Sequence, residues 1–173
     1  MRTLSSQTNN DSLEGICSII RATEAIHIQE IRILFREYQH YLDVDLGFQD
    51  FEDELASLPG DYRLPGGILL LAKVGNRIAG CVALRNLGKN ICEMKRLYVR
   101  PGFRGLRIGK RLAEAVIEEA ITIGYSHMRL DTLDSLTKAM QLYASLGFKR
   151  VPPYYPNPLQ GVVYWELDLR EHR

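Results

Sequence analysis

The sequence predicts an α/β protein with a mixed sheet in a single domain. The chain has 173 residues, the size of one ordinary domain, and 46% of them are apolar, which is enough to bury a core. Some segments repeat apolar residues at helical spacing, whereas others alternate them as strands do. In order these are a strand, two helices, an antiparallel run, then strand, helix, strand, helix and two strands, which is typical of a mixed sheet.

The first half of the chain predicts a strand, two helices and a hairpin. Residues 16–20 form a short apolar run, and apolar side chains then recur at helical spacing from Ala25 to Leu42. A second helix is expected over 48–58, because a Pro-Gly pair follows it. Residues 67–85 then read as two antiparallel strands joined by a turn at 74–77.

The strand that follows this hairpin changes phase. Cys92 and Met94 share one phase of the alternation, and Leu97 and Val99 share the other. One extra residue near Lys95-Arg96 would return all four side chains to one face, as a β-bulge does. A bulge leaves backbone groups unpaired, and such groups can bind a ligand.

The second half predicts a glycine-rich loop, two helices and three strands. The loop at 101–111 leads into a helix for which Gly124 is a suitable C-terminal residue. A strand at 127–133, with its end near Asp131, precedes a helix over 136–146. The last two strands flank a proline- and tyrosine-rich loop.

Composition and charge exclude several classes of function. The net charge is +1, so nothing in the overall charge favours nucleic acid or an anionic membrane as a partner. No apolar run approaches the roughly 20 residues that span a bilayer. Residues 1–14 lack the apolar stretch of a signal peptide and are expected to form a mobile tail before a domain over 15–173. The cysteines have no CxxC spacing, so we expect reduced side chains, no metal site and a cytoplasmic protein.

The loop at 101–111 is suited to an anion, because it combines three glycines with Arg and Lys and contains no carboxylate. Seven cations lie within 95–111 of a nearly neutral protein, which favours a polyanionic ligand. Gly105 and Gly109 are too close for a Walker A motif, and a Rossmann fingerprint would lie near the first strand. The remaining candidate is a diphosphate held by successive backbone N–H groups and a helix N-terminus.

A wider set of residues follows the order and spacing of a known signature: Arg104, Gly109, Ala139, Tyr143 and Leu146-Gly147-Phe148. By these residues the chain resembles the GNAT superfamily of N-acetyltransferases over about residues 68–169. The resemblance implies a single α+β domain with a mostly antiparallel sheet flanked by helices. It also implies a central strand with a β-bulge, followed by a pyrophosphate-binding loop and helix.

The resemblance further implies acetyl-CoA as the acetyl donor and direct transfer to a primary amine in a ternary complex. Tyr143 would protonate the leaving thiolate, and the N–H of Leu97 would face the thioester carbonyl. The residues expected to hold the coenzyme are Leu97, Val99, Arg104, Gly105, Leu106, Arg107, Ile108, Gly109 and Lys110. Two positions depart from the family pattern: Arg107 replaces a glycine, and Leu136 stands where many members have asparagine.

Several candidate residues have a structural alternative. Glu93 could deprotonate the amine directly or through water, or it could be a surface residue. Tyr143 lies on an apolar helical stripe, as a core tyrosine would. His127 is expected to be structural. The acidic zone at 43–61 and Tyr154-Tyr155 lead to the hypothesis of a cationic amine acceptor, and a solvated acidic helix face is the alternative.

The predicted activity is therefore N-acetylation of a small-molecule or peptide amine, with no nucleic acid, membrane or metal as a partner. A homodimer is left open. A non-catalytic acyl-CoA-binding sensor on the same fold is the first alternative, because a fold does not fix function. DNA binding by the basic cluster is the second, and it predicts steep salt dependence without affinity for coenzyme A.

Overall fold

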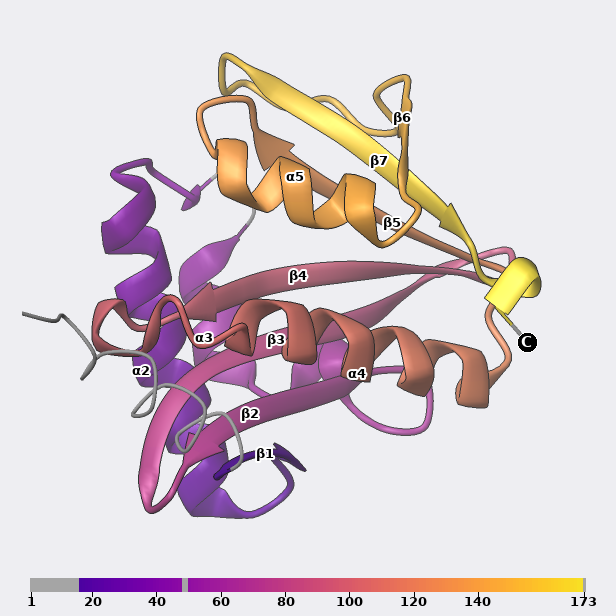
Figure 1. Ribbon diagram of the computed structural model, residues 1–173. Helices are drawn as coiled ribbons and strands as arrows, with labels where there is room; N and C mark the ends of the chain where they lie inside the picture. The colour runs from indigo at the N-terminus through magenta and orange to yellow at the C-terminus, as the bar shows by residue number, and fades with distance from the viewer. Residues whose placement is uncertain (1–15, 48–49, 173) are drawn as a thin grey trace, which may run out of the picture.

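The computed structural model describes residues 16–47 and 50–172, and in this part of the chain seven strands form one sheet with helices on both faces (Figure 1). The strands are β1 (Cys17–Arg21), β2 (Ile68–Val74), β3 (Arg77–Gly88), β4 (Ile91–Val99), β5 (His127–Leu133), β6 (Lys149–Val151) and β7 (Val162–Asp168). The helices are α2 (Ala25–Leu42), α3 (Phe51–Ser57), α4 (Ile108–Ile123) and α5 (Thr137–Ser145). The tail expected at 1–14 lies outside the described residues.

The strand order is β1-β2-β3-β4-β5-β7-β6. Every neighbouring pair is antiparallel except β4 and β5, which run parallel, so the predicted mixed and mostly antiparallel sheet is confirmed. The parallel pair is short. Along these two described strands, pairing covers Ile91–Glu93 and His127–Arg129 and then stops. Beyond that point β4 and β5 separate, and this separation creates the site described below.

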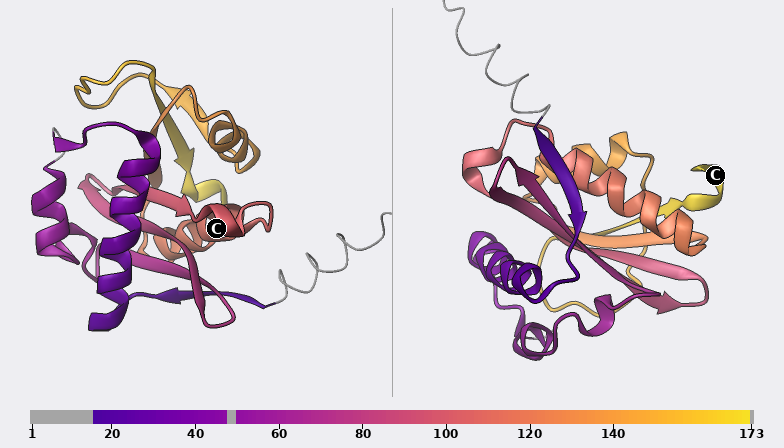
Figure 2. Two further views of the ribbon diagram at one scale, coloured as in Figure 1. Left: turned by 90° about the vertical axis from the view of Figure 1, so that its left-hand side faces the viewer. Right: turned by 90° about the horizontal axis from the view of Figure 1, so that it is seen from below.

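Two apolar cores lie on opposite faces of the sheet (Figure 2). On one face, α4 and α5 pack against alternate residues of the strands, such as Val82 and Leu84 of β3. On the other face, α2 and α3 pack against the residues between them, such as Cys81 and Ala83. The two-residue alternation of β3 therefore serves both cores, as expected for a strand covered on both sides.

The helix boundaries follow from local sequence. Helix α2 has the predicted bounds, and α4 ends at Gly124, whose φ of 106° lies in the left-handed region where glycine is favoured. Helix α3 begins at Phe51, later than the predicted start at residue 48, and residues 48–49 lie outside the described part. Strand β5 runs to Leu133, beyond the end expected near Asp131.

The predicted bulge in β4 is confirmed. Tyr98 lies opposite Cys81 and Lys95 lies opposite Ala83, so two residues of β4 face one residue of β3. Arg96, one of the two bulged residues, has a φ of 59°. The consequence predicted from the phase change also holds, because Cys92, Met94, Leu97 and Val99 all pack in the core beneath α4. Gly80 of β3 admits this distortion, since a Cβ there would collide with the carbonyl oxygen of Tyr98.

A buried ion pair holds the bulge against α3. The Nε of Arg96 lies 3.0 Å from Oε2 of Glu54, and the side chains are 4% and 14% exposed. Oε1 of Glu54 also accepts a hydrogen bond from the hydroxyl of Tyr62 at 2.6 Å. The guanidinium of Arg96 further packs against the ring of Phe51. A non-glycine residue with positive φ is thus fixed by contacts with residues far away in the sequence.

Glu54 is therefore expected to stabilise the fold far more than a neighbouring glutamate that also pairs with an arginine. Glu54→Ala would leave the buried Arg96 charge without its carboxylate, and removal of one partner from a buried pair costs about 3–5 kcal/mol. Glu52→Ala is the matched control, because Glu52 belongs to the same helix but forms an exposed pair with Arg36. Its effect on denaturant unfolding should be close to zero. Equal losses in the two variants would contradict the proposed role of Glu54.

Candidate active site

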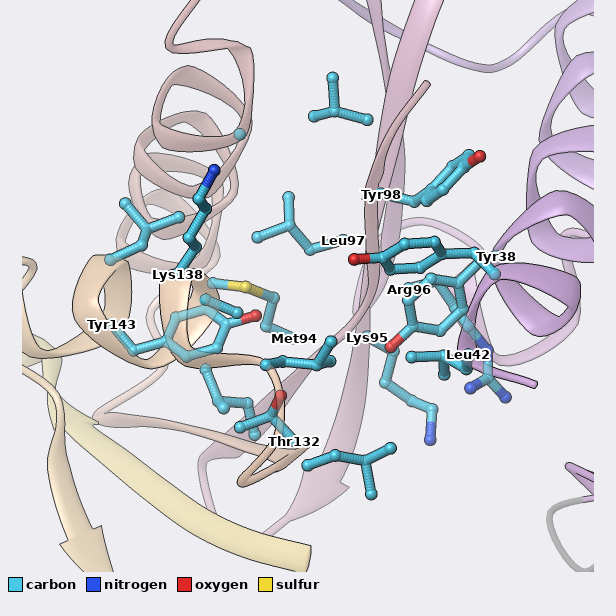
Figure 3. Close-up of a pocket in the computed structure, with 18 of the residues that line it drawn as sticks. Tyr38, Leu42, Met94, Lys95, Arg96, Leu97, Tyr98, Thr132, Lys138 and Tyr143 are labelled. Carbon is cyan, nitrogen blue, oxygen red and sulfur yellow. The ribbon is translucent and has the colours of Figure 1, made fainter. Parts of the chain in front are cut away.

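The separation of β4 from β5 opens a cavity of about 570 Å³. Its walls come from Met94–Val99 of β4, Leu130–Leu133 of β5, one side of α5 that includes Tyr143, and the C-terminal part of α2. Figure 3 shows Lys138 and Tyr143 of α5 on one side of β4, and Tyr38 and Leu42 of α2 on the other. The loop that precedes α4 contributes Arg104, Gly105 and Arg107 at one end. A cavity of this size can hold a ligand of drug-like dimensions.

The loop before α4 has the backbone of an anion cradle. Gly105 has a φ of 84° and Arg107 a φ of 58°, so left-handed residues occur twice within three positions, a backbone pattern from which anion-binding nests of N–H groups are built. Arg107 directly precedes the first turn of the 16-residue helix α4, whose N-terminus attracts negative charge. Arg107 therefore adopts the conformation that the usual glycine of the family would adopt. Leu106 and Ile108 are buried and anchor the loop, which leaves their backbone N–H groups as the parts able to contact a ligand.

The basic cluster at 95–111 divides into two groups. Arg96 pairs with Glu54, and Arg100 pairs with Glu37 of α2 at 2.9 Å, so these two arginines bind α3 and α2 to β4. Arg104 is exposed, donates a hydrogen bond from Nε to the carbonyl of Val99 at 3.2 Å and lies over the ring of Tyr41. Of the seven cations that favoured a polyanionic ligand, Arg96 and Arg100 are therefore engaged in ion pairs, and the loop cations remain the candidates for ligand binding.

Tyr143 is buried on α5 and its hydroxyl points into the cavity toward β4 (Figure 3). Its ring packs against Phe148 and Trp165, with centroids 5.8 and 6.5 Å away. No hydrogen bond joins the hydroxyl to another residue in the described ranges. Burial raises the pKa of this phenol well above its usual range, and Tyr38 and Asp131 add to the effect. The site therefore holds a protonated donor directed at open space.

Two further groups surround this hydroxyl. Tyr38 of α2 lines the same cavity, and burial raises its pKa to about 12 although Arg96 opposes the shift. Asp131 of β5 lines the cavity as well and accepts a hydrogen bond from Tyr155 at 2.8 Å. Neither residue belonged to the predicted set of site residues. Asp131 had one signal in the sequence, its position close to the C-terminal end of a strand.

Glu93 lies outside the cavity lining and is fully buried. Its Oε1 accepts a hydrogen bond from Nε of Arg85 at 2.8 Å and lies 3.7 Å from Nζ of Lys95. Its Oε2 accepts a hydrogen bond from the hydroxyl of Tyr154 at 2.6 Å. The structure therefore places Glu93 inside a network of three partners on β3, β4 and the loop after β6.

Lys95 is the member of this network that reaches the cavity. Its side chain is 6% exposed. Burial lowers the pKa of its ammonium to about 8, Arg96 and Arg85 act in the same direction, and Glu93 and Asp131 oppose them. The sequence showed Lys95 only as one of seven cations, and its burial could not be read from spacing.

None of the described acidic residues of the zone at 43–61 lines the cavity, although Leu46 of this zone does. Glu54 pairs with Arg96, Glu52 pairs with Arg36, and Asp45 accepts a hydrogen bond from the N–H of Gly47. Tyr154 and Tyr155 reach toward the sheet, where they contact Glu93 and Asp131. The hypothesis that the acidic zone attracts the acceptor is therefore not supported by its position.

An anion cradle at the mouth of a cavity, with a protonated tyrosine inside, is the arrangement expected of a site for an elongated anionic ligand. Residues 28–148 match the family described as acetyltransferase (GNAT) family, and the chain belongs to this family of N-acetyltransferases. It is 45% identical over 144 residues to a Schizosaccharomyces pombe protein described as an N-acetyltransferase, which covers 82% of this chain and 88% of the relative.

Solved structures show the same fold. A GNAT-family acetyltransferase from Staphylococcus aureus superposes with a TM-score of 0.73 at 24% identity, over 88% of this chain and 99% of that one. A Salmonella typhimurium structure, described as an acetyltransferase with its cofactor acetyl-CoA, superposes with a TM-score of 0.64 at 19% identity, over 91% and 96% of the two chains. This Salmonella protein of the same fold is thus described with bound acetyl-CoA.

None of the helices within 16–47 and 50–172 combines the length and apolarity needed to cross a membrane. The same residues contain no group of three or more His, Cys, Asp or Glu side chains placed to hold a metal ion.

Gly109 provides a clean test of the anion cradle. A Cβ at this position would touch only Cγ2 of Val99, at 3.8 Å, so Gly109→Ala should fold normally while crowding a bound diphosphate. Loss of one N–H contact to a charged acceptor costs about 1.5–3 kcal/mol, so we expect coenzyme A to bind about tenfold more weakly or worse in calorimetry. Gly109→Val should be affected more strongly.

Gly102→Ala is the control for this test, because Gly102 precedes the cradle and a Cβ there would meet no atom within 4 Å. Its affinity for coenzyme A should equal that of the wild type. Wild-type affinity in folded Gly109→Val would place the diphosphate elsewhere.

Proposed function

We propose that the protein transfers the acetyl group of acetyl-CoA directly to the primary amine of a small molecule or peptide. One observation supports this most strongly: a single cavity joins the anion cradle, the bulged part of β4 and the Tyr143 hydroxyl. These are the three parts that direct transfer requires, because the donor must be held, its carbonyl polarised and its sulfur protonated.

The coenzyme in this proposal follows β4 from the bulge toward α4. Within the described sheet, the β5 side of β4 has no strand partner after Glu93, so the backbone of Leu97 and Val99 can pair with the amides of the pantetheine arm. The diphosphate then meets the N–H groups of 104–110 and the exposed side chains of Arg104, Arg107 and Lys110.

The chemical step can be written with all atoms in balance. The acceptor ammonium loses one proton, and its lone pair attacks the thioester carbonyl while the N–H of Leu97 stabilises the negative oxygen that forms. As the intermediate collapses, the C–S bond breaks, the C–N bond remains and the sulfur takes a proton from Tyr143. The second proton lost from nitrogen restores Tyr143. The products are an N-acetylated amine, coenzyme A and one proton released to solvent.

In the proposed reaction, Glu93 acts without contacting the acceptor amine. Arg85, Lys95 and Tyr154 occupy its carboxylate, so direct contact with the acceptor amine would require one of them to move. Proton removal through water or through these partners remains consistent with its place next to Lys95. We therefore propose that Glu93 supports proton transfer at a distance and that it does not touch the acceptor.

Tyr143→Phe separates catalysis from folding. The variant keeps the packing against Phe148 and Trp165 and loses no hydrogen bond within the described chain, so its thermal stability should be unchanged. Loss of the proton donor should lower kcat about 10²-fold or more. The measurement is release of the coenzyme A thiol from acetyl-CoA over a panel of primary amines.

Tyr125→Phe is the matched control. The Tyr125 hydroxyl donates to the carbonyl of Gly66, outside the cavity lining, so this variant should lose about 0.5–1.5 kcal/mol of stability and keep its kcat. An unchanged kcat in Tyr143→Phe would make Tyr143 a packing residue. Binding of acetyl-CoA without thiol release for any amine would favour the alternative of a non-catalytic sensor.

A further inference from the structure

The cavity carries opposite charges on its two strand walls. Lys95 lines it from β4 and Asp131 lines it from β5. The two groups interact, since Asp131 opposes the lowering of the Lys95 pKa. Both lie apart from the anion cradle, which is formed by residues 104–110 at the end of the cavity next to α4. This part of the cavity is therefore free for the acceptor when the coenzyme occupies the cradle.

Several charged side chains surround Lys95. Arg96 has Glu54 as its carboxylate, and Arg129 has Glu166 at 2.7 Å. Glu93 serves two cations, because Arg85 contacts it at 2.8 Å and Lys95 lies 3.7 Å away. Lys95 is thus a buried ammonium whose carboxylate partner Glu93 also pairs with Arg85.

Such an ammonium favours the arrival of an anion. Burial is the main cause that destabilises the charged form of Lys95, and the neighbouring Arg96 adds repulsion. A carboxylate brought into the cavity would compensate for both effects and would be held by a charge-assisted hydrogen bond. Among the described residues, Asp131 is the single carboxylate in the cavity lining, whereas Lys95 offers a cation on the opposite strand wall, so the lining suits an acceptor that carries both an ammonium and a carboxylate.

Asp131 provides the complementary position for an amine. It lines the same cavity as the Tyr143 hydroxyl assigned to the leaving sulfur, and its charge helps to raise the pKa values of Tyr143 and Tyr38. Tyr155 holds its Oδ2 by a hydrogen bond at 2.8 Å and so fixes the carboxylate. An ammonium bound at Asp131 would therefore lie in the same cavity as the Tyr143 hydroxyl, which protonates the leaving sulfur.

From these observations we propose that the acceptor is a small amino acid, with its ammonium at Asp131 and its carboxylate at Lys95. The inference rests on the proposed acetyl transfer and specifies the substrate class of the same site. The cavity measures about 570 Å³ and has to hold the end of the coenzyme arm as well, which restricts the acceptor to small molecules. Lys95 is then a specificity-determining residue.

The test compares acceptors that differ only in the carboxylate. Thiol release from acetyl-CoA is measured with the L-amino acids and β-alanine, with the corresponding amides, and with propylamine as the decarboxylated control. We expect at least one amino acid to exceed its own amide in kcat/KM by about tenfold or more, because the amide cannot form the charge-assisted contact with Lys95.

Variants of Lys95 then test whether this residue causes the preference for the acid over its amide. In Lys95→Met the ratio of acid to amide should fall toward one, and Lys95→Arg should keep part of the preference. Lys149→Met removes an exposed lysine from β6, outside the cavity, and should leave the ratio unchanged. The ratio is measured within each variant, so a partly unfolded preparation does not alter it.

The outcomes separate this inference from the proposed function. Acetylation of amines without a preference for the carboxylate, or an unchanged ratio in Lys95→Met, would overturn the amino-acid acceptor and leave acetyl transfer standing. Binding of acetyl-CoA without turnover of any acceptor in the panel would overturn both.

Discussion

The bulge in β4 is the constraint on which the site depends. Arg96 can hold its left-handed backbone there because Glu54, 42 residues earlier, accepts hydrogen bonds from its buried guanidinium. The bulge turns Leu97 and Val99 back onto the face of Met94, and this happens where β4 leaves β5. A regular strand would bury its backbone groups in the sheet, whereas this one leaves them available along the wall of a cavity.

The elements around this opening contribute different parts of the site. Helix α4 begins at the anion cradle, α5 brings Tyr143 to the interior, and α2 closes the opposite wall with Tyr38. The buried Arg96 pairs with Glu54 of α3, and the partly exposed Arg100 pairs with Glu37 and so ties the end of β4 to α2. Function and stability therefore share residues on β4. Leu97, which is assigned to the thioester carbonyl, directly follows Arg96, which pairs with Glu54 of α3.

Much of the fold could be predicted from sequence because its signals are local. The phase change in 90–99 indicated the bulge, and Gly124 marked the end of α4. The charged contacts could not be predicted in this way. Arg96 meets Glu54 and Glu93 meets Tyr154 only after distant segments fold together, so spacing could not distinguish a ligand-binding cation from a buried pair. The roles of Lys95 and Asp131 depend on the same long-range placement.

Amide hydrogen exchange with and without coenzyme A tests the central claim most directly, because the claim concerns backbone groups. If the coenzyme pairs with the bulged strand and its diphosphate sits in the cradle, the amides of 97–99 and 104–110 should exchange more slowly in the complex, while those of β6 should not change. Protection confined to other segments, or none at 97–99 and 104–110 at saturating coenzyme A, would contradict this placement of the site.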